Sequence, residues 1–448
     1  MFVGIDFGTS NSSLALCDAS GLRFFELDAR HLNPRVLPSF TYVTRDHDIK
    51  VGVEAITMYL EEETGRRPVW ESLNLGQIEV TVGGPGSGPI TYMQELTAEV
   101  DVAANGRLLQ SIKTALRDAS YDGTQIFDRF YKIEELVAVL LSALRERCEQ
   151  AIGRPVRQAV LGRPVKYSDD AAVDRRAQDK MLEAARLAGF DEVVFELEPV
   201  GGAYLYHQSR PCRERVLVFD FGGGTLDMTI MEVGGATPPR TLATQGVLLG
   251  GDDLTAALMR TLLKWFGEGS CLPDGMPFPP HILEMLSSWQ SIVELSRPRF
   301  ASLLEQGKRG SDPQGIRRLE VLATRQLGFE LFQALEKTKM GLSSQDVVRL
   351  VFERDGLSLK EYVIRSTFES LIRQEVERTD AAIDELLTKS GLAADDISGV
   401  LRTGGSSEIP VFVDLLARRF GPDRIQAIDA FTTITGGLAL KGRELDVG

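Results

Sequence analysis

The tripeptide Asp-Phe-Gly occurs twice in this chain, each time where an apolar strand runs into a cluster of small residues. Residues 3–11 read Val-Gly-Ile-Asp-Phe-Gly-Thr-Ser-Asn, and residues 216–227 read Val-Leu-Val-Phe-Asp-Phe-Gly-Gly-Gly-Thr-Leu-Asp. Each segment predicts a β-hairpin whose tip can hold phosphate. Glycine lets backbone N–H groups approach oxyanions closely, and a short acid beside them can hold a hydrated Mg²⁺. Two such hairpins indicate two related lobes that grip one nucleotide between them.

The composition is that of an ordinary globular protein. Of the 448 residues, 43% are hydrophobic and 25% are charged, which is ample for two hydrophobic cores. The net charge of −14 argues against a general nucleic-acid binder, which should carry a basic surface. No apolar run approaches the roughly 20 residues of a membrane span, and the chain enters a strand at Phe2 without a signal peptide. We therefore expect a cytoplasmic protein without a membrane association.

The cysteines and histidines are scattered. Their spacing favours reduced structural thiols and speaks against a His/Cys metal site or a Ser-His-Asp triad. The residues concerned are Cys17, Cys148, Cys212, Cys271, His31, His47, His207 and His281.

Strand and helix signals alternate along the chain, which favours α/β lobes. Residues 133–152 carry apolar side chains at helical spacing and are followed by Gly153, so they predict one helix. Elsewhere the patterns predict a Gly/Pro loop at 83–89, a short helix at 107–118, a mostly helical region at 251–362 and a single long helix at 361–390.

Three further motifs accompany the two hairpins. Residues 198–203 read Glu-Pro-Val-Gly-Gly-Ala, residues 249–253 read Leu-Gly-Gly-Asp-Asp, and residues 401–410 read Leu-Arg-Thr-Gly-Gly-Ser-Ser-Glu-Ile-Pro. In this order, and over nearly the whole chain, the motifs resemble the nucleotide-binding domain of the heat-shock protein 70 chaperones, within the actin and sugar-kinase superfamily.

The resemblance implies an α/β, two-lobed actin-like ATPase fold. Its duplicated ribonuclease-H-like lobes enclose a nucleotide cleft, and the terminal helix packs back toward the first lobe. The implied boundaries are lobe I at 1–210 (core 1–38 and 131–210, smaller subdomain 39–130) and lobe II at 211–448 (core 211–250 and 363–448, smaller helical subdomain 251–362).

The same resemblance implies four catalytic residues. Asp6 and Asp220 would hold Mg²⁺ through water from opposite lobes. Lys113 would neutralise charge on the γ-phosphate in the transition state. Glu198 would orient the attacking water or relay the nucleotide state.

It also implies the residues that bind ATP or ADP. Those of the two hairpins would cradle the phosphates, two on a later helix would bond the ribose, and Ser343 would reach the base. The full set is Gly8, Thr9, Ser10, Gly222, Gly223, Gly224, Thr225, Gly250, Gly251, Glu336, Lys339, Ser343, Gly404, Gly405 and Ser406.

The chain departs from the family pattern at three places. The family stacks adenine between two arginines, whereas the matching positions here are Met340 and Glu408, so a guanidinium sandwich on the base is lost. The family's switch proline matches Pro164, but basic residues surround it. The chain ends soon after Leu440, from which we expect a branch of the family that consists of the nucleotide-binding domain alone.

The leading hypothesis is an Mg²⁺-dependent ATP-binding protein with slow ATP hydrolysis. It would act as a chaperone-like conformational switch whose open and closed lobes are read by a protein partner or cochaperone. An actin-like filament protein is one alternative, and a small-molecule kinase with Asp227 as its base is another. A binding module that does not hydrolyse ATP is the third.

Overall fold

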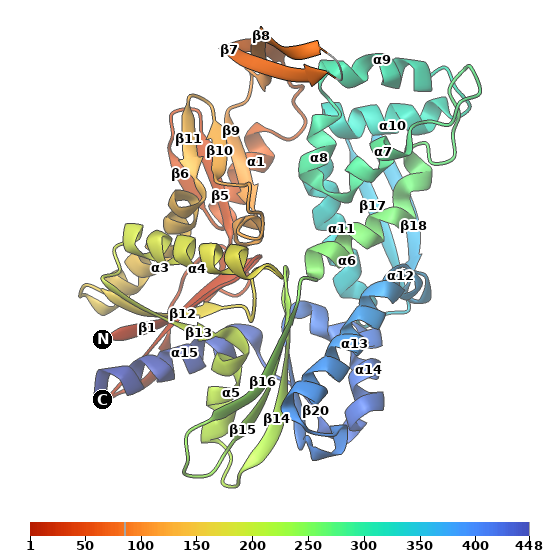
Figure 1. The fold of residues 1–448 in the computed structure, drawn as a ribbon. Coiled ribbons are helices and arrows are strands. Elements are labelled where there is room, and N and C mark those ends of the chain that lie inside the picture. Colours follow the sequence, from red (N-terminus) through yellow and green to blue (C-terminus); the bar gives the residue numbers. More distant parts are fainter. Residues whose placement is uncertain (85–86, 448) are drawn as a thin grey trace.

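The computed structural model describes residues 1–84 and 87–447, and its two lobes stand side by side (Figure 1). Lobe I, on the left in the figure, is built on a sheet with the order β13-β12-β1-β2-β3, and β4 pairs with β2. Its strands are β1 (Phe2–Phe7), β2 (Asn11–Asp18), β3 (Gly21–Phe24), β4 (Leu37–Pro38), β12 (Gln158–Arg163) and β13 (Glu192–Leu197).

Lobe II is built on a second sheet with the order β16-β15-β14-β19-β20. In each lobe, three antiparallel strands are followed by two parallel ones, and this repeat confirms the predicted duplication. The strands of the second sheet are β14 (Glu214–Phe221), β15 (Leu226–Val233), β16 (Arg240–Val247), β19 (Gly399–Thr403) and β20 (Ile425–Ala427).

Helices cover both sheets. The predicted helix at 133–152 is present as α3, and it ends where Gly153 adopts the left-handed conformation (φ 72°). The side chain of Asp170 caps α4 by accepting from two backbone N–H groups. The helices against the two sheets are α3 (Ile133–Ile152), α4 (Ala171–Leu187), α5 (Glu198–Gln208), α13 (Arg373–Ser390), α14 (Pro410–Phe420) and α15 (Ala430–Val447), with short 3₁₀ turns at Ala394–Asp396, Gly405–Glu408 and Pro422–Arg424.

The terminal helix α15 packs on lobe I, as expected. It lies so close to β1 that a side chain on Gly4 would overlap the backbone of Ala439. The backbone N–H of Phe2 donates to the Asp446 carboxylate at 3.1 Å. Figure 1 accordingly shows both ends of the chain on the same side of the molecule.

A smaller unit stands on each core, and the long hairpin β7–β8 extends at the top of the molecule (Figure 1). Above lobe I lie β5 (Phe40–Thr44), β6 (Ile49–Val51), α1 (Val53–Glu62), β7 (Trp70–Gly84), β8 (Ser87–Asp101), β9 (Gly106–Gln110), α2 (Ile112–Ala115), β10 (Gly123–Ile126) and β11 (Arg129–Lys132).

Above lobe II the chain is mainly helical. The elements are α6 (Gly251–Met259), η1 (Arg260–Phe266), α7 (Pro280–Glu284), η2 (Met285–Ser287), α8 (Trp289–Glu294), α9 (Pro298–Gly307), α10 (Pro313–Thr324), α11 (Gly328–Leu342), β17 (Val347–Arg354), β18 (Leu357–Ile364) and α12 (Arg365–Leu371). The domain boundaries given above stay a prediction.

The region predicted as one helix at 361–390 is instead a strand and two helices. Strand β18 continues to Ile364, and α12 and α13 are separated at Ile372. The strand signal was the alternation of buried Leu357, Leu359 and Val363 with exposed neighbours, a period of two that was overlooked.

Two other predictions need correction. Residues 107–118 are largely strand β9 and the single-turn helix α2, because Ser111 between them has φ 55°, which a helix does not allow. The Gly/Pro run at 83–89 forms the end of a long hairpin, with strand on both sides, and its residues 85–86 lie outside the described residues. No sequence signal had predicted β7–β8.

Aromatic side chains join the two smaller units above the cleft. The ring of Tyr59 on α1 lies 5.8 Å from that of Trp289 and 5.4 Å from that of Phe329, measured between centroids. Trp289 Nε1 also donates to Gln110 Oε1 at 2.7 Å. We call this cluster, with Phe40 packed against Phe329 at 5.8 Å, the roof.

Candidate functional site

The tips of the two predicted hairpins meet between the lobes. A Cβ on Gly223 would overlap Ser10 Oγ, and a Cβ on Gly224 would lie 2.6 Å from Thr9 Oγ1. Only glycine therefore allows β14–β15 to approach β1–β2 so closely. The structure brings these four residues together, as the sequence predicted for a phosphate cradle.

The later glycine motifs converge on the same tip. The backbone N–H of Gly251 donates to Gly222 O at 3.0 Å, at the start of α6. Gly404, at φ 81°, leaves no room for a side chain beside Phe221 O. The hydroxyl of Ser406 lies 3.4 Å from the same carbonyl oxygen of Gly222. The remaining predicted residues of these turns are Gly8, Thr225, Gly250 and Gly405, which lie at the same turns.

A buried ion pair lies beside the cradle. Lys113 Nζ donates to Glu198 Oε1 at 2.6 Å, and both side chains are less than a tenth exposed. Burial lowers the pKa of Lys113, but the negative charges of Glu198 and Asp6 outweigh it, so the pKa is raised overall. The ammonium group therefore stays charged. The sequence predicted both residues for the site but not their pairing.

Three aspartates around this pair hold their protons unusually tightly. Burial first, and the charge of Glu198 second, raise the pKa of Asp6 to about 7 and that of Asp227 to about 6. The same two causes raise the pKa of Asp220 well above its ordinary value. Lys113 is the cation that opposes these shifts. If all the carboxylates of the cluster were ionised, their negative charge would exceed the positive charge of Lys113.

A divalent cation would relieve this excess charge, and the donors fit Mg²⁺. Among the described residues there is no group of three or more His, Cys, Asp or Glu side chains that could hold a metal ion. Mg²⁺ in nucleotide sites usually keeps several waters and takes phosphate oxygens beside one or two carboxylates, and Asp6 and Asp220 are the carboxylates that would hold it here.

The two residues predicted for the ribose form a network at the start of α6. Lys339 Nζ donates to Gly251 O and to Thr255 Oγ1, both at 2.9 Å, and pairs with Glu336 at 2.8 Å. The Glu336 side chain is 48% exposed and also accepts from Thr255 Oγ1 at 2.7 Å. Ser343 follows at the end of α11.

The positions predicted for base stacking differ in their surroundings. Met340 is 66% exposed, which leaves its thioether side chain free to pack on a ring. Glu408 is half-exposed and pairs with Arg402 at 3.2 Å. The sequence reasoning missed Arg402, which lies within the quoted motif, is buried, and also donates to Ser407 O at 2.6 Å.

The segment around Pro164 links the lobes. The backbone N–H of Val165 donates to Asp227 Oδ1 at 2.7 Å, across the cleft. The guanidinium of Arg163 donates to the carbonyl oxygens of Pro164 at 3.1 Å and Val165 at 3.2 Å. Arg163, one of the basic residues that distinguish this segment, is therefore hydrogen-bonded to the segment's own backbone.

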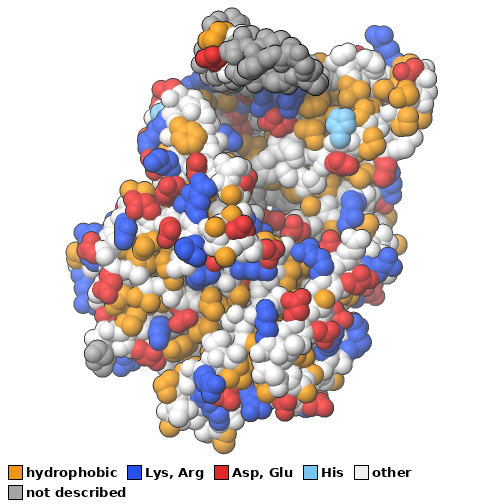
Figure 2. Space-filling model, in the orientation of Figure 1, with side chains coloured by type: hydrophobic (Ala, Val, Ile, Leu, Met, Phe, Trp, Pro, Cys, Tyr) orange, Lys and Arg blue, Asp and Glu red, His pale blue; other side chains and the backbone are white. Residues whose placement is uncertain are grey.

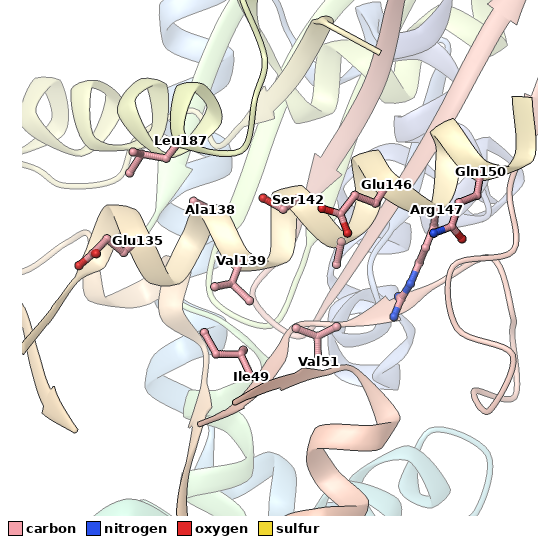
Figure 3. A pocket seen from close by; sticks show the side chains of 11 residues that line it. Ile49, Val51, Glu135, Ala138, Val139, Ser142, Glu146, Arg147, Gln150 and Leu187 are labelled. Carbon is pink, nitrogen blue, oxygen red and sulfur yellow. The ribbon is translucent and has the colours of Figure 1, made fainter. Parts of the chain in front are cut away.

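Two cavities lie away from the cradle. The first, about 590 Å³, lies between α3 and β6 (Figure 3), and the second, about 770 Å³, lies between α6 and α7. None of the predicted site residues lines either one. The first is lined by Ile49, Val51, Glu135, Ala138, Val139, Ser142, Ala143, Glu146, Arg147, Gln150 and Leu187.

Acidic and basic side chains are interspersed over both lobes on the face that Figure 2 shows. No helix in residues 1–84 and 87–447 is both long and apolar enough to cross a bilayer.

Comparison with known proteins gives one consistent family. A model of the Hsp70 protein family matches residues 106–272 and 317–446. The chain is 26% identical to the chaperone protein dnaK of Cyanidioschyzon merolae, in an alignment that covers 98% of this chain and 61% of that protein. It is 27% identical to the chaperone protein DnaK of Thermosipho melanesiensis over 74% of this chain and 48% of that protein.

A third relative, the chaperone protein dnaK of Trieres chinensis, is 26% identical over 96% of this chain and 60% of its own length. The chain thus spans about half to three fifths of the length of these curated relatives. The family match and the repeated sheets together confirm the predicted actin-like ATPase fold. The chain belongs to the heat-shock protein 70 family.

Proposed function

We propose that this chain binds ATP and ADP with Mg²⁺ between its lobes, hydrolyses ATP slowly, and acts as a chaperone-like conformational switch. The observation that carries the proposal is the meeting of the two glycine hairpins, Thr9–Ser10 and Gly223–Gly224, next to the buried side chains of Lys113 and Asp220. Glycine turns flanked by buried carboxylates and one lysine suit a polyphosphate with its metal.

Each charged residue has a physical role in this proposal. Mg²⁺ would neutralise phosphate charge, held by Asp6 and Asp220. Lys113 keeps its proton, so it would stabilise charge that develops on the terminal phosphate. Glu198 accepts a hydrogen bond from Lys113 at 2.6 Å, which fixes its carboxylate, and it would orient the attacking water.

A change in the cleft can reach a partner through the lobe contacts. Val165, next to Pro164, is bonded to Asp227 in the other lobe at 2.7 Å. Closing or opening of the cleft therefore moves the Pro164 segment relative to β15. A partner protein that reads this relative position would complete the switch.

The small-molecule kinase alternative needs a free carboxylate that can act as a base. Asp227 was the candidate, but it is buried and one of its oxygens accepts the Val165 N–H. The geometry therefore favours a structural role for Asp227. The filament alternative is tested by light scattering with and without ATP.

The proposal is tested by thermal unfolding with millimolar ATP and Mg²⁺. A ligand at ~100 times its Kd adds about 2.7 kcal/mol to the free energy of unfolding, so Tm should rise by several degrees. Asp220→Asn should lose most of the Mg²⁺-dependent part of the rise, whereas Asp423→Asn, in the turn before β20, should keep it. An unchanged wild-type Tm would contradict the proposal.

A further inference from the structure

The segment 111–117 presents one face to each lobe. Ile112 and Leu116 are buried in the core of lobe I. Ser111, Thr114 and Arg117 are spaced three residues apart, which places them on one side of a helical turn. All three lie against lobe II, as the contacts below show. Lys113, which belongs to the proposed catalytic set, lies within the same turn.

Ser111 anchors this turn to lobe II. Its φ of 55° lies in the left-handed region, which residues other than glycine rarely adopt and which costs free energy. In this conformation its hydroxyl donates to Asp252 Oδ2 at 2.9 Å, at the start of α6. The strained residue thus fixes where the following turn meets lobe II.

Arg117 reaches the second phosphate hairpin. Its Nη2 donates to the carbonyl oxygen of Gly224. A Cβ on Gly224 would lie 3.1 Å from Arg117 Nη2 and 3.2 Å from Thr114 Oγ1, as well as 2.6 Å from Thr9 Oγ1. Three side chains of lobe I therefore surround one glycine of the phosphate cradle.

The hydroxyl group of Thr114 lies at the same point. Its Oγ1 is buried and has no hydrogen-bond partner among the described residues. A buried hydroxyl without a partner is unfavourable, and a ligand oxygen that accepts from it would remove the cost. The guanidinium of Arg117 is also largely removed from solvent, which lowers its pKa, yet an arginine remains charged.

We infer that Thr114 and Arg117 are binding residues that recognise the terminal phosphate of a bound nucleoside triphosphate. The inference rests on the proposed nucleotide site and extends it. Thr114 supplies a hydroxyl donor, and Arg117 supplies positive charge and holds the Gly224 carbonyl. A diphosphate lacks the group that they recognise, so they make the chain distinguish ATP from ADP.

The test is isothermal titration of ADP and of a non-hydrolysable ATP analogue, each with Mg²⁺. Thr114→Val and Arg117→Gln should each weaken the triphosphate about tenfold or more while ADP affinity changes less than about twofold. Thr114→Ser, which keeps the hydroxyl, should retain the wild-type ratio. The matched controls are Thr237→Val and Arg186→Gln, because both residues are exposed and are distant in sequence from the segment 111–117.

The outcomes separate the two proposals. If the variants weaken ADP and the triphosphate equally, or leave the ratio unchanged, the inference is overturned and the nucleotide site stands. If the wild-type chain binds neither nucleotide, both are overturned. Should Thr114→Val fail to fold, as judged by its unfolding transition, Thr114→Ala carries the same measurement, and Arg117→Gln tests the guanidinium independently.

Discussion

The floor and the roof of the cleft join the same two lobes by different means. At the floor, glycine backbones meet hydroxyl side chains, as where Gly224 faces Thr9. At the roof, large rings fill the space, with Tyr59 packed on Trp289 and Phe329. The floor is thus shaped by close backbone contacts at the hairpin tips, whereas the roof is shaped by side-chain volume and holds the lobes together.

A second contact strengthens the roof. Trp70 Nε1 at the base of hairpin β7–β8 donates to Ser296 Oγ at 3.2 Å, and the Arg297 guanidinium lies 4.8 Å from the Trp70 ring. The hairpin and helices α8 and α9 all lie outside the ranges that the family model matches. This contact between the lobes needs no ligand.

The largest expected effect is on the roof. Trp289→Ala should lower the free energy of unfolding by about 3–5 kcal/mol, because it removes a buried ring and leaves a cavity between the lobes. Chemical denaturation followed by circular dichroism measures it, and Trp289→Phe should lose much less. A loss below about 1 kcal/mol would show that the roof does not hold the lobes.

At the floor, even one added methyl group should disturb the contact between the lobes. Gly224→Ala places a Cβ 2.6 Å from Thr9 Oγ1 and should cost about 1–3 kcal/mol of stability, with weaker nucleotide binding. Gly405→Ala is the matched control for stability, since nothing lies within 4 Å of its Cβ position. Equal Tm values for the two variants would mean that the hairpin tips do not meet.

The comparison also explains what the sequence could predict. Asp6 and Asp220 could be predicted because the hairpin tips and their acids are local patterns that lie within a few residues, whereas Lys113 and Glu198 were predicted from the resemblance to the family. The roof was not predicted, because Tyr59 and Trp289 are far apart in sequence and an aromatic residue in a helix gives no sign of its partner. The left-handed backbone of Ser111 could not be predicted either, because the partner of its hydroxyl, Asp252, is far away in the sequence.

The floor should also make the ligand-free protein sensitive to pH. The pKa of Asp6 rises from 3.8 to about 7 on folding, so the folded protein keeps a proton that the unfolded chain releases. Stability should therefore fall as the pH rises from about 4 to 7. In EDTA, Asp6→Asn should flatten this profile and gain roughly 1–3 kcal/mol at pH 8. Parallel profiles for variant and wild type would exclude Asp6 as the cause.

The smallest expected effect concerns the base. The stacking positions hold Met340 and Glu408, and Glu408 is paired with Arg402. The affinities for ATP and GTP should therefore lie within roughly tenfold of each other, a difference of ~1.4 kcal/mol in binding free energy. Competition against a fluorescent nucleotide measures the ratio. A preference for ATP above a thousandfold would show that other residues hold the base.

The central claim is that one nucleotide is bound by both hairpins at once, at the floor and beneath the roof. A crystal structure of the chain grown with a non-hydrolysable ATP analogue and Mg²⁺ tests it most directly. The account predicts phosphates bound by the two turns that carry Thr9 and Gly224, with the metal beside Asp6 and Asp220. Phosphates bound elsewhere, or a nucleotide that contacts only one lobe, would contradict it.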